Sequence, residues 1–161
     1  MIQKQYQKLL DGIFKTVFTL LALMVAAMVV IGFMQVFWRY ILMSSLSWSE
    51  ETLRYVNIWT IFLGAGLCIP RGLHTAIEAI YSVLSPKSGA AMIRVVELLG
   101  CAFAMLMTVV GWSFSAFNAA QVSPTMQVPM IYVYISIPIG GVLMLMFQIG
   151  EMLKPRKGGA A

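Results

Sequence analysis

Charged side chains are scarce in this chain of 161 residues. Asp, Glu, Lys and Arg make up 11% of it, apolar residues make up 60%, and the stretch from Leu98 to Gly150 has no charged side chain. Soluble globular domains carry about 25% charged residues. The composition therefore excludes a water-soluble domain, and the apolar stretches are expected to lie in lipid.

Residues that bind metals and cofactors are equally few. The sequence has one histidine, His74, and two cysteines, Cys68 and Cys101. A catalytic zinc ion needs three protein ligands, and a haem in a helical membrane subunit ordinarily needs two. We therefore expect no metal and no cofactor. The net charge of +5 is unaccompanied by a phosphate loop or a nucleic-acid module, so we expect no nucleic-acid partner either.

Four stretches are long enough to cross a bilayer, which takes about 20 apolar residues in a helix. Ser47 and Glu50 have the spacing of a capping box at the start of the second helix, and Pro70 is expected to end it. The sequence predicts an all-α membrane protein with a single domain over 1–161 and transmembrane helices at about 13–40, 48–70, 89–117 and 129–152.

The distribution of basic residues indicates the orientation. Lys and Arg that flank spans stay in the cytoplasm. Two basic residues, Arg39 and Arg54, lie on one predicted side, and nine lie on the other. We therefore expect both termini in the cytoplasm, with the Arg39–Arg54 and Asn118–Pro129 loops on the outer side of the membrane.

The segment 72–86 between the second and third spans is predicted to be a short amphipathic helix in the headgroup region, because apolar residues recur in it at helical spacing. His74 and Glu78 are four residues apart and would share one face of this helix. A structural contact between them is the simplest interpretation. Metal binding and a proton-linked role are the alternatives.

One polar and small-residue stripe follows the second helix. Lipid would leave the Asn57 amide unsatisfied and would gain nothing from Gly64, whereas another helix could bond the amide and pack on the glycine. We therefore expect this stripe to face protein. Its members are Glu50, Arg54, Asn57, Gly64, Cys68 and Arg71. On the third and fourth helices, Gly100 with Ala104 and Gly140 with Gly141 offer similar points of close approach.

Three glutamates are the candidate ionisable groups. Glu50 and Glu51 open the second helix, and we expect Arg39 to contact one of them; general acid/base work or cation binding is the alternative to such a helix-start cluster. Glu97 lies about two turns inside the third helix, where carboxylates are costly. It could pair with Arg94, or with Arg71 or a partner chain.

The order of these features resembles the small membrane subunit of tripartite ATP-independent periplasmic (TRAP) transporters. The resemblance covers about residues 33–151. It departs from the family at Glu78, where members often have Asp. The residues that carry it are Phe37-x-Arg39-Tyr40, Trp48-Ser49-Glu50-Glu51, Arg54-Tyr55, Gly64-Ala65, Arg71-Gly72-x-His74, Ser123-Pro124, Pro129 and Pro138.

The resemblance implies a complex of three proteins: a periplasmic solute-binding protein, a large multi-helix subunit that moves the solute with sodium, and this chain as a non-catalytic brace in the lipid bilayer. The solute could be a sialic acid, a dicarboxylate, a sugar acid or a sulfonate. A self-contained homodimeric exporter of cations is the alternative. It would need a carboxylate near the middle of the bilayer, and the glutamates lie toward helix ends.

Overall fold

The computed structural model describes residues 2–44, 46–81 and 86–153, with side chains described outside 2–4, 71–81, 86–88 and 90–91. Within these residues the helices are α1 (Ile2–Ile41), α2 (Ser47–Tyr81), α3 (Pro86–Phe117), α4 (Ile131–Tyr134) and α5 (Ser136–Met152). Four stretches of the described chain are long and apolar enough to cross a membrane, which confirms the predicted all-α fold: Gln5–Ile41, Ser47–Pro70, Met92–Phe117 and Ile131–Met152.

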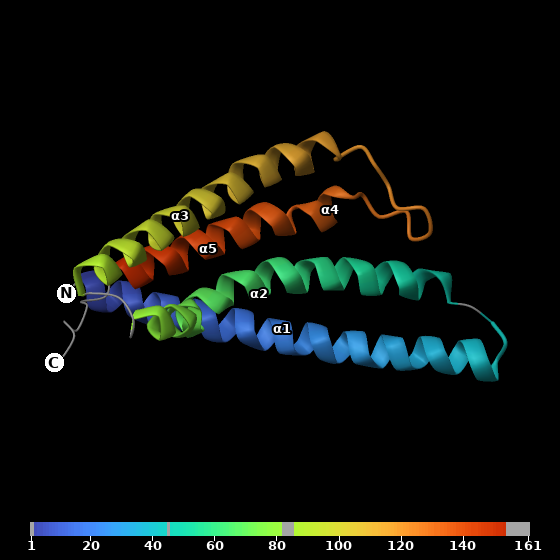
Figure 1. Cartoon of the computed structure of the whole chain (residues 1–161). Helices are drawn as coiled ribbons and strands as arrows, with labels where there is room; N and C mark the ends of the chain where they lie inside the picture. Colours follow the sequence, from blue (N-terminus) through green and yellow to red (C-terminus); the bar gives the residue numbers. More distant parts are fainter. Residues whose placement is uncertain (1, 45, 82–85, 154–161) are drawn as a thin grey trace.

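The last helix is the central one. α5 lies between α2 and α3, and α1 packs mainly against α2 on the outside (Figure 1). Half of the most apolar window of the Ile131–Met152 span is buried, whereas none of the corresponding window of α1 is. Most of the apolar surface of α1 and α3 therefore faces away from the chain, toward lipid or another protein.

Two adjacent glycines let α5 sit close to both neighbours. A Cβ on Gly140 would lie 2.7 Å from the carbonyl oxygen of Phe62 on α2. A Cβ on Gly141 would lie 2.8 Å from the backbone nitrogen of Thr108 and 3.0 Å from the carbonyl oxygen of Ala104, both on α3. The expected close approach at this glycine pair is confirmed. No larger residue fits at either position without moving a helix backbone.

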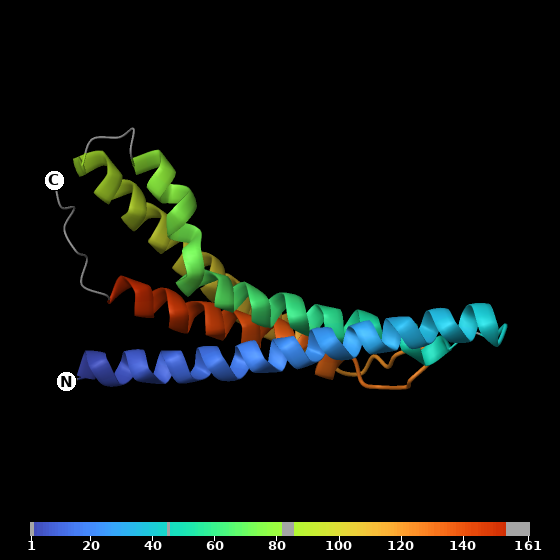
Figure 2. The same ribbon diagram turned by 90° about the horizontal axis from the view of Figure 1, so that it is seen from below.

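Helix α2 does not end at Pro70, where the sequence analysis placed its boundary. The assigned helix continues through this proline to Tyr81. Figure 2 shows that α2 bends along its length and that its remainder turns away from α1, and Pro70 is the proline inside this helix. Proline removes one hydrogen bond and crowds the preceding turn, so it can kink a helix without ending it. The predicted separate helix over 72–86 is thus the bent end of α2, and residues 82–85 lie outside the described residues.

A second proline, Pro138, interrupts the helical hydrogen bonds of the Ile131–Met152 span. A turn at Ile135 separates α4 from α5. Pro138 has no N–H to donate to the carbonyl of Tyr134, so the ladder of helical hydrogen bonds lacks one rung here. The hydroxyl of Ser136 donates to the carbonyl oxygen of Val133 at 2.7 Å. The span still crosses as one stretch, beginning at Ile131 rather than at residue 129.

Helix α1 begins about ten residues earlier than the predicted start at residue 13. The hydroxyl of Tyr6 donates to the carbonyl oxygen of Met146, and the amide of Gln7 donates to that of Gly150, both at 3.0 Å. Leu10, one turn further on, is 5% exposed and packs with Phe147. These contacts with the end of α5 keep the first turns helical, although they contain several charged residues.

Trp59 links α2 to α4, because its indole Nε1–H donates to the carbonyl oxygen of Tyr132 at 3.0 Å. We expect Trp59→Phe to lower the free energy of unfolding in detergent micelles by about 1 kcal/mol, the usual net contribution of one hydrogen bond. Trp112→Phe is the control, because Trp112 is 61% exposed. Equal losses for the two variants in chemical denaturation would contradict this role of the indole.

Candidate partner-binding surfaces

Glu51 anchors the long loop between α3 and α4. This residue is 5% exposed, in the first turns of α2. Its Oε1 accepts the backbone N–H of Thr125 at 2.9 Å, and its Oε2 accepts that of Met126 at 3.0 Å. The hydroxyl of Thr52 also reaches the sulfur of Met126 at 3.3 Å. Both oxygens of the carboxylate therefore hold the loop, which the sequence analysis did not foresee.

The anchored loop is a short hairpin. Val122 and Pro129 form an antiparallel bridge, and the N–H of Ser123 donates to the carbonyl oxygen of Val128 at 2.9 Å. Ser123 is fully buried, and its hydroxyl accepts the N–H of Val128. Gln127 adopts a positive φ of 55° to close the turn. An exposed, hydrogen-bonded hairpin is thereby presented at this end of the molecule, which we call the loop end.

Arg39 does not make the contact with a glutamate that the sequence predicted. Among the described residues it forms no ion pair. The Gln35 amide instead donates to Glu50 Oε1 at 3.4 Å. Arg39, Glu50 and Leu46 line a hollow of about 140 Å³ beside this pair. Among the described residues, no hydrogen bond joins Ser47 to Glu50, as the expected capping box would require.

The polar stripe of α2 divides between two environments. Arg54 and Asn57 are exposed and line a groove of about 560 Å³ between α1 and α2. Neither side chain forms a hydrogen bond or an ion pair with the described part of the chain. Gly64, two turns further along, instead lies toward Leu21 of α1. Arg54 and Asn57 are therefore accessible to a partner, Gly64 lies against α1, and Cys68 further along the stripe is again exposed.

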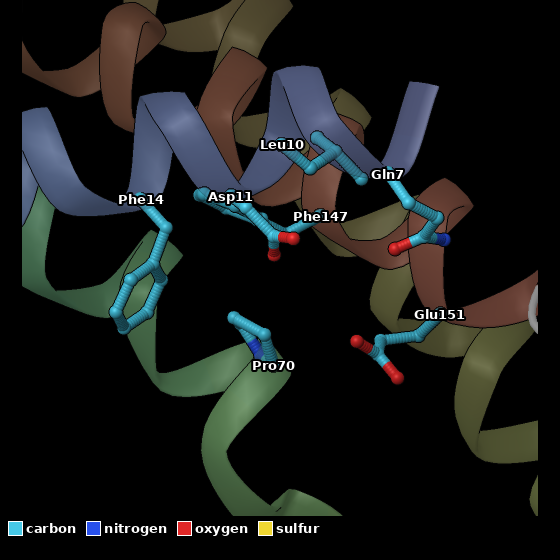
Figure 3. A pocket seen from close by; sticks show the side chains of 7 residues that line it. All are labelled: Gln7, Leu10, Asp11, Phe14, Pro70, Phe147 and Glu151. Carbon is cyan, nitrogen blue, oxygen red and sulfur yellow. The ribbon is translucent and has the colours of Figure 1, made fainter. Parts of the chain in front are cut away.

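The other end of the bundle, which we call the terminal end, has an acidic hollow of about 260 Å³ that sequence reasoning missed. Figure 3 shows the carboxylates of Asp11 on α1 and Glu151 on α5 directed toward it, with Pro70 of α2 on the facing side. These residues are far apart in sequence, so only the packing of α1 against α5 could reveal the site. No three metal-ligating side chains gather anywhere in the described residues.

The remaining predicted residues lie near the terminal end or at helix starts. Glu97 is buried at 6% exposed on α3, whereas Arg94, one turn earlier, is exposed. Trp48 is 40% exposed at the start of α2. The side chains of three residues, and with them the expected contact between two, lie outside the described residues: Arg71, His74 and Glu78.

Comparison with known proteins adds a family and several relatives. The family described as "Tripartite ATP-independent periplasmic transporters, DctQ component" matches residues 28–158. The ectoine TRAP transporter small permease protein TeaB of Halomonas elongata is 25% identical over 86% of this chain and 77% of its own length. The sialic acid small permease SiaQ of Vibrio cholerae is 23% identical over 83% and 78%. The C4-dicarboxylate small permease DctQ of Rhodobacter capsulatus is 26% identical over 62% and 45%.

Proposed function

Because this chain belongs to the DctQ-component family of the TRAP transporters, whose members are small permease subunits and not enzymes, we propose that it braces a large membrane subunit that moves the solute. The observation that carries the proposal is the unburied apolar surface of α1, a span whose most apolar window has no buried residue. A helix that packs so little within its own chain is suited to lie against a larger neighbour as well as lipid.

The anchored hairpin and the α1–α2 turn supply the second part of the proposal. Both lie at the loop end, and the scarcity of basic residues there favours a position outside the cytoplasm. We assign this end to the periplasm of a bacterial inner membrane, where a solute-binding protein would dock, and both termini to the cytoplasm.

In this proposal the partner proteins, and not this chain, bind the transported solute. The relatives carry names for ectoine, sialic acid and C4-dicarboxylate transport. Proteins of one fold that serve such different solutes are unlike a subunit that binds the solute itself. We infer a small organic acid as the solute class and sodium as the driving ion, both handled by the large subunit.

Coexpression tests the bracing role. We expect this chain to copurify with the large subunit, and proteoliposomes that contain both to take up the solute captured by the binding protein when a sodium gradient is applied. Vesicles that lack this chain should lose most of the uptake. The proposal is wrong if the large subunit alone transports at the full rate, or if this chain alone moves solute or cations.

A further inference from the structure

The groove between α1 and α2 is lined by two polar side chains, Arg54 and Asn57, that have no hydrogen-bond or ion-pair partner within the described part of the chain. Arg54 lies seven residues after the start of the Ser47–Pro70 span, which corresponds to about 10 Å along a helix. Asn57 lies almost one turn deeper. Val25 and Val29 of α1 form the apolar opposite wall, and both are exposed.

Phospholipid is a poor occupant of this groove. An arginine can extend its long side chain toward the headgroups, but the short side chain of asparagine cannot. An unsatisfied amide in hydrocarbon costs several kcal/mol by transfer scales. Thr60, which lines the groove beside them, satisfies its own hydroxyl by donating to the carbonyl oxygen of Val56 at 2.8 Å. Of the polar side chains in the groove, Asn57 is therefore the one that lipid leaves unsatisfied, and a partner that bonds it would also lie beside Arg54.

The groove between α3 and α5 provides a contrast. It has a volume of about 400 Å³ and is lined by Trp112, Ile139 and other apolar residues. Its one hydroxyl, that of Thr108, donates to the carbonyl oxygen of Ala104 at 2.8 Å within α3. Acyl chains can fill such a surface without cost. Of these two grooves, the one between α1 and α2 combines an apolar wall with a cation and an amide that have no partner within the described part of the chain.

We propose that the groove between α1 and α2 receives a transmembrane helix of the large subunit, and that a carboxylate on this helix pairs with Arg54. The proposal rests on the proposed function. A membrane helix brings apolar side chains for Val25 and Val29. A carboxylate matches the guanidinium by charge and can bond it through two parallel N–H groups. A nearby hydroxyl or backbone carbonyl on the same helix would satisfy Asn57.

The test is a charge exchange in the coexpressed complex. Arg54→Glu should reduce the amount of copurified large subunit at least about tenfold, because it places two negative charges together away from water. Each acidic residue in the membrane helices of the large subunit is then changed singly to Arg. One of these changes should restore copurification with Arg54→Glu and weaken it with the wild-type chain.

Arg39→Glu is the matched control, because Arg39 is also an exposed arginine near the loop end but lies outside the groove. It should leave copurification unchanged. The melting temperature of each purified variant separates a binding defect from misfolding. If Arg54→Glu does not accumulate, Arg54→Gln replaces it and is tested against the same series of acidic-to-Arg changes in the large subunit. The acidic partner of Arg54 is then the residue whose change to Arg weakens copurification with the wild-type chain but not with Arg54→Gln.

Each result decides between distinct ideas. If the wild-type chain does not copurify with the large subunit, the proposed function itself fails. If the wild-type chain copurifies and Arg54→Glu does so equally well, only the groove proposal fails. Loss of tightly bound phospholipid from Arg54→Glu, with the protein complex intact, would identify a lipid headgroup as the occupant and would also overturn the proposal.

Discussion

Gly141→Leu is expected to separate α5 from α3 and to lower the free energy of unfolding by about 3 kcal/mol, the upper range for overpacking a tight core. A Cβ at this position would lie 2.8 Å from a backbone nitrogen and 3.0 Å from a backbone oxygen of α3. Backbone atoms cannot rotate aside as a side chain can, so the whole helix must move. Chemical denaturation of the chain purified in detergent measures the effect.

Gly32→Leu is the matched control for this prediction. Gly32 lies on α1 and has nothing within 4 Å of where its Cβ would be. Leucine also favours the helix more than glycine does. This variant should keep or slightly raise stability. A Gly141→Leu protein as stable as the Gly32→Leu protein would contradict the tight contact between α5 and α3.

Glu51→Gln is expected to release the hairpin. The charged carboxylate accepts two backbone N–H groups at once, whereas the neutral amide offers one acceptor oxygen and places an NH₂ donor against the second N–H. We expect hydrogen exchange at Thr125 and Met126 to accelerate on the order of tenfold or more, because loop opening becomes easier. Exchange mass spectrometry on peptides covering 118–130 measures it.

Glu50→Gln is the control for the loop prediction, since Glu50 is the exposed neighbour and bonds only to Gln35 in the described chain. In the Glu50→Gln variant, the rates of hydrogen exchange at the hairpin should match those of the wild-type chain. If the solute-binding protein docks on this end, only Glu51→Gln should also weaken docking. Equal acceleration by the two variants would show that general charge loss, and not the anchor, governs the loop.

The sequence was sufficient for the features that depend on length and polarity. Four long, mainly apolar stretches can do little else than cross a bilayer, and adjacent glycines in an apolar span permit close helix contacts on two sides. That the stripe of α2 faces a partner protein stays a prediction: Arg54 and Asn57 are exposed, whereas Gly64 lies against α1.

The features that depend on which helices are neighbours could not be derived from the sequence. Glu51 looks like any acid at a helix start until the hairpin, over seventy residues away, is placed beside it. In the same way, Asp11 and Glu151 line one hollow only because α1 lies along α5. Pro70 is ambiguous for a different reason, because proline is compatible with both a helix end and a kink.

The central position of α5 has a consequence for biosynthesis. The ribosome makes this helix after the other three spans, so those spans enter the bilayer before the helix that joins α2 to α3 exists. Until then, Phe62 of α2 and Thr108 of α3 lack the glycine pair of α5 against which they pack. A nascent chain stalled before Ser136 would therefore be an inserted but unassembled protein, and a natural target for membrane quality-control proteases.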